Sequence, residues 1–250
     1  MKQLKFFLLL LIGMIALTTL NSCETEDFGN QGGGGKRLVK ITNAYHGANL
    51  TFHYKNGKLS KITDRYDDDS VADINYNGKI VRIVSEDIEG TLQLNNDGYA
   101  KSLTSNDYYE INFEYSNGYL TKLIYSDEDN VSGTVNIQYD TNGNLLTMSE
   151  IINEFGSVSE NKYTFTSSNY PLKGKSYSFL MYCDFEFLFP LYYAGLLGKD
   201  PKNLLSKIDI KETYNGHVYN NTYTFDYLFY DDGYVNKITR NSESMVLTYE

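Results

Sequence analysis

Residues 51–62 read Thr51-Phe-His-Tyr-Lys-Asn-Gly-Lys-Leu-Ser-Lys-Ile62, and this pattern decides the fold because five such units follow one another up to residue 148. Each unit holds an alternating apolar run, an Asn-Gly or Asp-Gly dipeptide and a second short apolar run. The dipeptides are Asn56-Gly57, Asn77-Gly78, Asp97-Gly98, Asn117-Gly118 and Asn142-Gly143. Both central residues of a type I′ turn need positive φ, which Gly, Asn and Asp tolerate best. The stretch from Thr51 to Met148 therefore predicts five consecutive β-hairpins.

The apolar residues before each turn are spaced two apart, as strands with one buried face require. They are Phe52 and Tyr54, Ile74 and Tyr76, Leu92 and Leu94, Phe113 and Tyr115, and Ile137 and Tyr139. Polar residues occupy the positions between them, so we expect one apolar face and one solvated face. After the turn, apolar residues stand second and fifth from the glycine, as Leu59 and Ile62 do. Those two positions have opposite parity, which predicts a β-bulge just after each turn.

The two ends of the folded region read as the two halves of one divided hairpin. Residues 36–41 match the run that follows a turn, and residues 245–250 match the run that precedes one. In every unit those halves are antiparallel neighbours, so we predict that the last strand pairs with the first. Closure would remove exposed sheet edges that otherwise recruit other chains. The predicted fold is all-β, an antiparallel up-and-down meander of repeated hairpins in a closed or nearly closed barrel. An open, coiled meander sheet is the alternative.

An insertion at residues 170–203 interrupts the hairpin pattern and contains all three prolines of the chain. Proline is poorly tolerated in paired strands. Residues at helical spacing are Leu188, Leu191, Tyr192, Gly195 and Leu196, with Gly198 as the expected C-terminal cap. They predict a short helix of roughly ten residues. A wide barrel cannot fill its lumen with wall side chains alone, so we expect this helix to plug the interior. The alternative is a lid or membrane-dipping segment, which would expose Phe185, Phe187, Phe189 and Tyr193 as one patch.

The first residues carry the features of a secretion signal. Lys2 and Lys5 precede an apolar run at residues 6–17, which is too short for a comfortable membrane span. The following Leu20-Asn-Ser-Cys23 resembles the bacterial lipoprotein box. The resemblance implies that residues 1–22 are a lipoprotein signal peptide and that Cys23 becomes the lipidated first residue of the mature chain. Stable anchoring requires more than one acyl chain. An ordinary signal peptide followed by an incidental cysteine is the alternative.

Residues 23–35 form an acidic start and a glycine-rich tether. Glu24, Glu26 and Asp27 stand directly behind the cysteine, and four consecutive glycines occupy residues 32–35. The acidic cluster resembles the export signal of Bacteroidota surface lipoproteins, which implies an outer membrane lipoprotein exposed at the cell surface. A solvated spacer is the alternative. The region from Lys36 to Glu250 has the size of a single β-domain.

Charge and cysteine content restrict the partners. The formal net charge is −10, and it becomes −12 once the two lysines of residues 1–22 are removed. Such an acidic chain would repel nucleic acids and anionic lipid headgroups, so we expect no nucleic acid partner and membrane contact through the N-terminal lipid anchor only. With Cys23 acylated, Cys183 is the one other cysteine in the sequence, which excludes a disulfide framework.

Residues for catalysis, cofactors or metals do not stand out in this sequence. The three histidines, His46, His53 and His217, fall in separate units without a cysteine or carboxylate at ligand spacing. The acidic runs at residues 67–69 and 127–130 do not match a calcium-binding loop. A phosphate loop, a dinucleotide-binding fingerprint and a Gly-x-Ser-x-Gly motif are all missing. We therefore predict no catalytic, cofactor-binding or metal-binding residues and no enzymatic activity.

These features and the segment Pro190-Leu-Tyr-Tyr-Ala-Gly-Leu-Leu-Gly-Lys199 together resemble a Bacteroidota lipoprotein family of unknown function described as having a porin-like fold. The resemblance covers nearly all of residues 36–250. It implies a closed or nearly closed antiparallel barrel, and it brings no known catalytic or ligand-binding residues. Membrane porins turn an apolar band to lipid and a polar face to the lumen. Here we expect the dense apolar face to point inward, so we interpret "porin-like" as barrel geometry without a membrane-spanning wall.

Three functional hypotheses from different classes follow. The first is a non-catalytic surface module that binds a glycan, a peptide or a protein through its loops and exposed tyrosines. The second is a carrier that holds a hydrophobic small molecule in an aromatic-lined lumen. The third is a hydrolase, which would need a convergent carboxylate pair or a Ser-His pair in one cleft. The predicted location and architecture favour the first.

Overall fold

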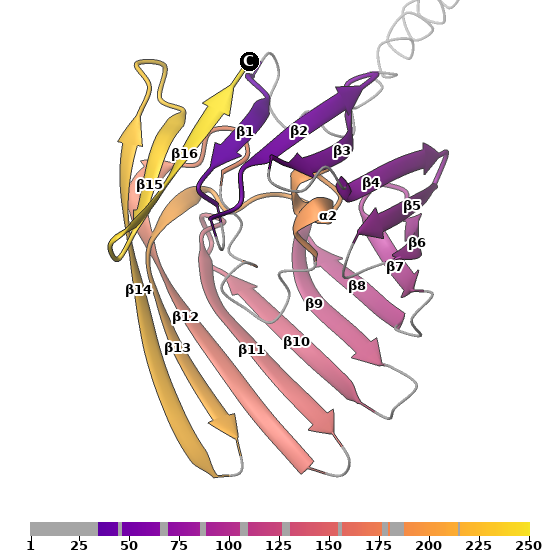
Figure 1. The fold of residues 1–250 in the computed structure, drawn as a ribbon. Coiled ribbons are helices and arrows are strands. Elements are labelled where there is room, and N and C mark those ends of the chain that lie inside the picture. Colours follow the sequence, from indigo (N-terminus) through magenta and orange to yellow (C-terminus); the bar gives the residue numbers. More distant parts are fainter. Residues whose placement is uncertain are drawn as a thin grey trace, which may run out of the picture.

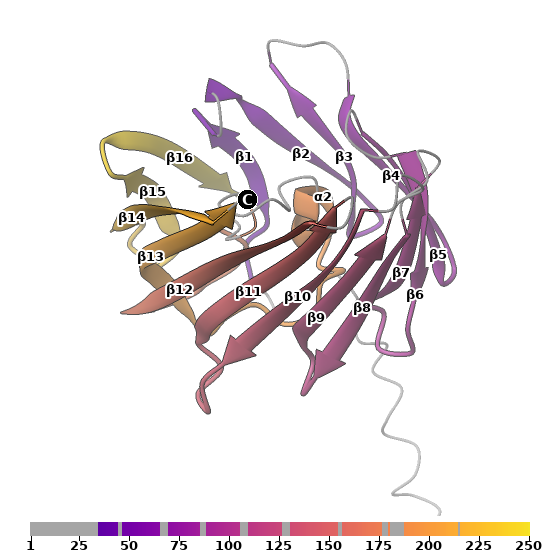
Figure 2. The same cartoon turned by 90° about the horizontal axis from the view of Figure 1, so that it is seen from below.

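The computed structural model describes residues 35–44, 47–65, 70–85, 89–105, 110–126, 131–154, 157–176, 180, 188–214 and 216–250. Within these residues, sixteen antiparallel strands follow one another around a single closed barrel (Figures 1 and 2). One short helix, α2 (Phe189–Tyr193), lies inside the ring of strands. The all-β meander barrel predicted from the hairpin repeat is therefore confirmed.

The first part of the wall is built from short strands. They are β1 (Leu38–Thr42), β2 (Leu50–Lys55), β3 (Lys58–Asp64), β4 (Ser70–Asn77), β5 (Ile80–Ser85), β6 (Glu89–Leu94), β7 (Ala100–Ser105), β8 (Glu110–Ser116) and β9 (Tyr119–Ser126). The rest are β10 (Ser132–Tyr139), β11 (Leu145–Glu154), β12 (Ser157–Pro171), β13 (Asn203–Tyr214), β14 (His217–Phe229), β15 (Val235–Arg240) and β16 (Glu243–Tyr249). Figure 1 shows the ends of β11 to β14 projecting beyond the short strands, so the wall is taller on that side.

The barrel closes between the strands that the sequence predicted. β1 pairs with β16, where Ile41 lies opposite Leu247, and it pairs with β2 on its other side. Two backbone hydrogen bonds of 2.8 and 2.9 Å between Arg37 and Glu250 extend the contact to the ends of the ladder. Both terminal strands thus have partners on both sides, and the open-sheet alternative is wrong.

The hairpin turns are of more than one kind. Asn56-Gly57 and Asn117-Gly118 have positive φ at both central residues, as the predicted type I′ turn requires. At Gly98 and Gly143 only the glycine has positive φ, and its N–H donates to the carbonyl three residues earlier. That is a type I turn followed by a left-handed glycine. At Asn77-Gly78, too, only the glycine has positive φ. The type I′ prediction is therefore wrong for these three hairpins, although the hairpins themselves are present.

The predicted bulge after the turn is present in most units. On β2 and β3, Tyr54 pairs with Leu59 and His53 pairs with Lys61, so the ladder skips one residue. Equivalent shifts occur next to the turns that join β6 to β7, β8 to β9 and β10 to β11. The β4–β5 hairpin differs because its ladder runs without a shift. There Ile80 faces outward and is 49% exposed, so the bulge prediction is wrong for that unit.

The inner face of the wall forms the hydrophobic core. Along β8, for example, Ile111 and Phe113 are buried, whereas Glu110, Asn112 and Glu114 between and beside them are exposed. Strands around the whole ring contribute buried apolar side chains to one continuous cluster. Burial of each large apolar side chain stabilises the fold by roughly 1.5–3 kcal/mol. The period-two pattern read from the sequence therefore corresponds to the inside and the outside of the barrel.

Helix α2 occupies the predicted plug position, but it is shorter than predicted. Gly195 has φ +74° and its N–H donates to the Tyr192 carbonyl, while the Leu196 N–H donates to the Leu191 carbonyl. These two bonds form a Schellman motif, which ends the helix one turn earlier than expected. The predicted cap at Gly198 is therefore wrong. Tyr193 is buried, contrary to the exposed-patch alternative, and Phe185 and Phe187 of that patch lie outside the described residues.

The segment after α2, residues 195–203, binds the turns at one end of the barrel, and we call it the rim segment. Its backbone bonds join Leu196 O to Ala100 N, Lys199 N to Gly118 O, and Lys202 N to Gly143 O, at 2.7–2.9 Å. Gly198 permits this approach, since a Cβ there would lie 2.5 Å from the Gly118 oxygen. The rim segment thus fixes both the helix and the neighbouring hairpins in place.

Candidate functional site

The predicted lipid attachment site lies outside the described residues. Cys23, the signal peptide at residues 1–22 and nearly all of the tether fall there, as do Cys183, His46 and both acidic runs. Lipidation therefore stays a prediction. Of the other histidines, His53 lies 3.0 Å from the Thr63 hydroxyl on the outer face, and His217 begins β14. Among the described residues, no three histidine, cysteine or acidic side chains lie close enough together to hold a metal ion.

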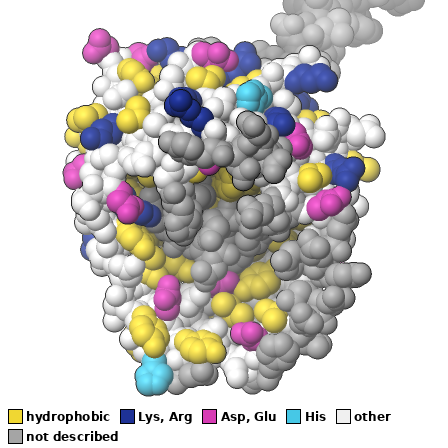
Figure 3. Space-filling view, in the orientation of Figure 1, with side chains coloured by type: hydrophobic (Ala, Val, Ile, Leu, Met, Phe, Trp, Pro, Cys, Tyr) yellow, Lys and Arg dark blue, Asp and Glu magenta, His cyan; other side chains and the backbone are white. Residues whose placement is uncertain are grey.

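The outer face of the wall is polar and charged. Arg82 on β5 and Glu89 on β6 form an ion pair of 2.6 Å, and Lys122 on β9 lies 3.6 Å from Glu114 on β8. Figure 3 shows side chains of both charges interspersed with hydrophobic ones, and the described residues form no continuous hydrophobic band on the face in view. A basic side chain at the midplane of a lipid-facing wall costs about 2–4 kcal/mol. This outer face is therefore suited to water.

The exposed apolar side chains gather mainly on the tall side of the wall. Those on β11 to β14 are Leu146, Ile151, Val158, Tyr170, Tyr214, Val218, Tyr219 and Leu228. They alternate with polar residues such as Lys162 and Lys211 along the same strands. Among the described residues, the helical segments are all too short to cross a membrane.

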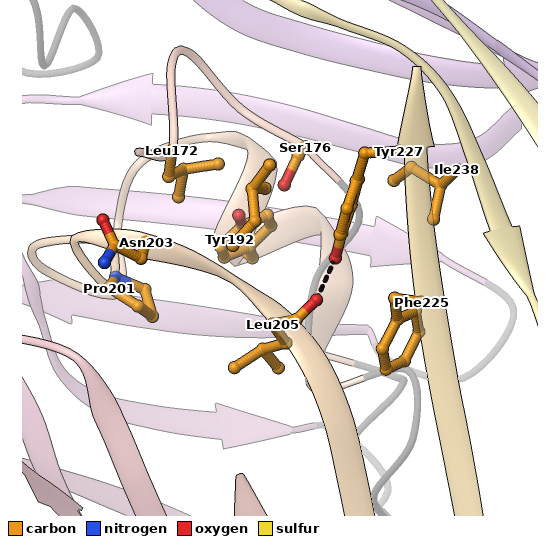
Figure 4. Close-up of a pocket in the computed structure, with 10 residues that line it drawn as sticks. Leu172, Ser176, Tyr192, Pro201, Asn203, Leu205, Phe225, Tyr227 and Ile238 are labelled. Atoms are coloured by element: carbon orange, nitrogen blue, oxygen red, sulfur yellow. Dashed lines mark hydrogen bonds between the residues drawn. The ribbon is translucent and has the colours of Figure 1, made fainter. Parts of the chain in front are cut away.

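The cavities beside α2 that described residues line are small. The cavity in Figure 4 lies between Tyr192 of the helix and Phe225 of β14, and its volume is about 40 Å³. The Tyr227 hydroxyl donates a hydrogen bond of 2.6 Å to the Leu205 carbonyl beside it. A second space, next to Leu197, measures about 10 Å³. Ligand pockets usually measure about 300–1,000 Å³, so these spaces suit single water molecules and give no support to the carrier hypothesis.

A partly buried ion pair joins the rim segment to the chain before α2. The Lys175 ammonium lies 2.8 Å from both carboxylate oxygens of Asp200 and 4.4 Å from the centre of the Tyr192 ring. Burial raises the pKa of the Tyr192 hydroxyl, and the nearby Asp200 carboxylate adds to that shift. The charges are paired and packed against the helix, so this group suits a structural role.

Sequence reasoning missed a buried carboxylate inside the barrel. Glu150 on β11 is 1% exposed, and its two oxygens accept hydrogen bonds from the Tyr125 hydroxyl at 2.8 Å and the Asn161 amide at 3.0 Å. A signal was present, because Glu150 has the parity of Met148 and therefore belongs to the apolar face. A polar residue in that phase indicates a buried and hydrogen-bonded group.

A wide opening lined by described residues lies between the ends of two neighbouring strands. β9 and β10 are paired from Ser126 opposite Ser132 to Lys122 opposite Asn136. Beyond this last pair both strands continue, β9 back to Tyr119 and β10 on to Tyr139. Between these unpaired ends is an opening of about 560 Å³, which we call the β9–β10 cleft. Its lining is Ser116, Asn117, Tyr119, Thr121, Ile137, Gln138, Tyr139, Asp140, Thr141, Asn142, Gly143 and Leu146.

Two tyrosines and a hydrogen-bonded turn shape this cleft. The rings of Tyr119 and Tyr139 have centroids 4.7 Å apart and are tilted by 36°. Gly143 lies under the Tyr119 hydroxyl, where a Cβ would come within 2.2 Å. Asp140 accepts hydrogen bonds from the backbone and side chain of Asn144, and these bonds lower the pKa of its carboxyl group. The sequence predicted both turns beside the cleft but did not predict that the strands separate.

Comparison with known proteins identifies the fold. No protein-family model and no curated protein sequence matches the chain. The structure of a porin-like protein from Bacteroides vulgatus matches with a TM-score of 0.62 and 16% identity, covering 86% of this chain and 99% of that one. A porin-like protein from Bacteroides uniformis matches with a TM-score of 0.59 and 16% identity, over 85% of this chain and 96% of that one. The porin-like fold implied by the sequence resemblance is therefore confirmed over most of the chain.

Proposed function

We propose that this protein is a non-catalytic binding module, held at the outer membrane by lipid on Cys23 and exposed to the aqueous medium. It would engage a glycan, a peptide or another protein through the surface of its barrel. The membrane contact would be made by the acyl chains and not by the wall.

The observation that carries this proposal is the polarity of the two faces of the wall. A porin needs a polar lumen and an apolar outer band. This barrel has Leu92 and Leu123 fully buried inside, and paired charges such as Arg82 and Glu89 outside. Because α2 also fills part of the interior, the geometry favours a solid body in water over a channel.

The anchor is tested by labelling cells with an alkyne analogue of palmitate. The full-length chain should incorporate the label, and a Cys23→Ser variant should not. A Cys183→Ser variant is the matched control and should label like the natural chain. Label that persists in Cys23→Ser would contradict the proposed anchor.

The binding role is tested with the purified full-length protein in a zwitterionic detergent. We expect saturable binding to a member of a panel of extracellular proteins, peptides and glycans, and no conductance in a planar lipid bilayer. Stepwise ion conductance, or turnover of a bound ligand into a product, would contradict a non-catalytic surface module.

A further inference from the structure

We infer that the β9–β10 cleft is a binding site for a short neutral saccharide. The inference rests on the proposed function, because it gives the binding module a site and a class of ligand. Three properties of the cleft carry it, namely a fixed opening, an aromatic floor and polar edges whose nearby charges sum to zero.

The opening is held in place from both sides. β9 keeps its ladder with β8 up to the Ser116–Tyr119 pair, and β10 keeps its ladder with β11 up to the Tyr139–Leu145 pair. The rim segment binds each adjoining turn as well, through Gly118 on one side and through Gly143 on the other. The unpaired ends of β9 and β10 are therefore not frayed ends. They are two anchored hairpins that stand apart, which makes the cleft a preformed site.

The floor of the cleft is aromatic. Tyr119 and Tyr139 stack with a tilt of 36°, and the turn glycine Gly143 leaves room for the Tyr119 hydroxyl above it. Tyrosine combines a flat apolar ring with a polar tip. A pyranose ring has the complementary form, since one face carries C–H groups and its edge carries hydroxyl groups. Leu146, which is 42% exposed, adds apolar surface beside the rings.

The edges of the cleft are polar, and the one charged group in its lining is already engaged. The Asp140 carboxylate accepts hydrogen bonds from the Asn142 N–H, the Asn144 N–H and the Asn144 side-chain amide, at 2.8–2.9 Å. The neighbouring Lys199 ammonium donates to the Asn117 carbonyl at 2.9 Å. The two charges have opposite signs and lie at the same site, so the surroundings of the cleft carry no net charge that would select an anionic or a cationic ligand, which favours a neutral one.

The remaining polar groups suit hydroxyl groups of a ligand. Gln138 uses its side-chain oxygen to accept a hydrogen bond from Thr147 at 3.0 Å, which leaves its amide N–H groups to donate into the cleft. Thr141 and Asn142, which carry a hydroxyl and a side-chain amide, line the cleft as well. An apolar ligand would bury these groups without partners, at a cost of about 1–3 kcal/mol each. The volume of about 560 Å³ lies within the usual range for small-molecule sites.

The test uses the full-length protein in a zwitterionic detergent, because alkyl glycoside detergents would compete for the site. The probes are neutral oligosaccharides of glucose, galactose, mannose and N-acetylglucosamine, screened on an array and titrated by calorimetry. Four variants are compared with the natural chain. Tyr119→Ala removes one ring of the floor, and Gln138→Ala removes a hydrogen-bond donor. Leu146→Trp places a larger side chain over the opening, since Leu146 lies at its edge and is 42% exposed. Tyr214→Ala, at the far end of β13, is the control.

We expect at least one neutral oligosaccharide to bind saturably. Tyr119→Ala and Leu146→Trp should each weaken its affinity by about tenfold or more, and Gln138→Ala should weaken it by a smaller factor. Tyr214→Ala should leave the affinity unchanged. Leu146→Trp adds atoms at the surface and removes no packing, so it keeps the test valid if Tyr119→Ala fails to fold.

Two results would overturn the inference and leave the proposed function standing. One is binding of proteins or peptides with no neutral saccharide bound, and the other is saccharide binding that Tyr214→Ala abolishes and Leu146→Trp does not affect. Hydrolysis of a saccharide that binds in the cleft would have the opposite effect. It would support the site and contradict the non-catalytic function.

Discussion

Replacement of Leu191 by alanine tests whether α2 packs as a plug. Leu191 is 1% exposed at the centre of the helix. The substitution removes three carbon atoms, which at roughly 0.8 kcal/mol each is a loss of about 2.4 kcal/mol in transfer free energy. A closed ring of strands cannot collapse freely around the vacated space, so a cavity penalty adds to this loss. We expect the free energy of unfolding to fall by about 3–4 kcal/mol.

The effect is measured by thermal and urea unfolding, followed by far-ultraviolet circular dichroism. For a chain of this size the midpoint of thermal unfolding should fall by roughly 6–16 °C, with an unchanged urea m-value. Leu228→Ala is the matched control, since this leucine is 60% exposed on β14 and should change stability by less than about 0.5 kcal/mol. A loss at Leu191 no greater than the loss at Leu228 would refute the packing of α2 against the wall.

Three further predictions test separate contacts. Gly198→Ala should destabilise the protein more than Gly57→Ala does in urea titrations. Both glycines have positive φ, but only a Cβ at position 198 would meet a backbone oxygen. Equal losses of stability would argue against that close approach. Gly133→Ala should cost about 1–3 kcal/mol, since its Cβ would lie 2.2 Å from the Tyr125 ring, and a neutral result would disprove that contact. Burial raises the pKa of Tyr54 to about 12, so the native state holds this proton more tightly than the unfolded chain does. Stability should therefore be independent of this group below about pH 10 and should fall as the pH rises toward 12. The measurement is the urea stability of the natural chain and of a Tyr54→Phe variant between pH 9 and 12, and an equally steep loss of stability in both would contradict this.

The parts of the fold that depend on local sequence were predictable. Hairpins need only a turn dipeptide between two alternating runs, and both features lie within about a dozen residues. Closure of the barrel was also predictable, because Ile41 and Leu247 belong to two half-units that are neighbours in every complete unit. The phase of each strand then decided which face became the core.

The type of turn was missed although a local signal existed. Asn95 and Asp140 stand at the first position of the two type I turns, and their side-chain oxygens accept backbone N–H groups two and four residues later. Asn and Asp favour that position for this reason. Asn56 and Asn117 instead adopt positive φ themselves. The residue two places before each dipeptide carries this information better than the dipeptide does.

The end of α2 and the cleft were missed because they depend on contacts between distant segments. Gly195 and Gly198 are both plausible caps in sequence, and the choice rests on the bond from Leu196 to Leu191. The turn-side ends of β9 and β10 are unpaired, as are those of β3 and β4, so this feature recurs in the repeat. What is particular to the cleft is the rim segment, whose Lys199 and Lys202 bind the two turns. Those contacts join residues about 60–80 positions apart, so periodicity along the chain gives no sign of them.

The central claim is that the apolar face of the wall points inward and the polar face meets water, and cysteine accessibility tests it most directly. In a Cys183→Ser chain, Arg82→Cys places a thiol on the outer face at the middle of β5, and Leu92→Cys places one on the buried inner face of β6. Isolated, permeabilised cell envelopes are treated with a membrane-impermeant maleimide. We predict rapid labelling at position 82 and labelling at position 92 only after denaturation. Protection at position 82 together with labelling at position 92 would reveal a lipid-facing wall around a water-filled lumen, and would contradict the claim.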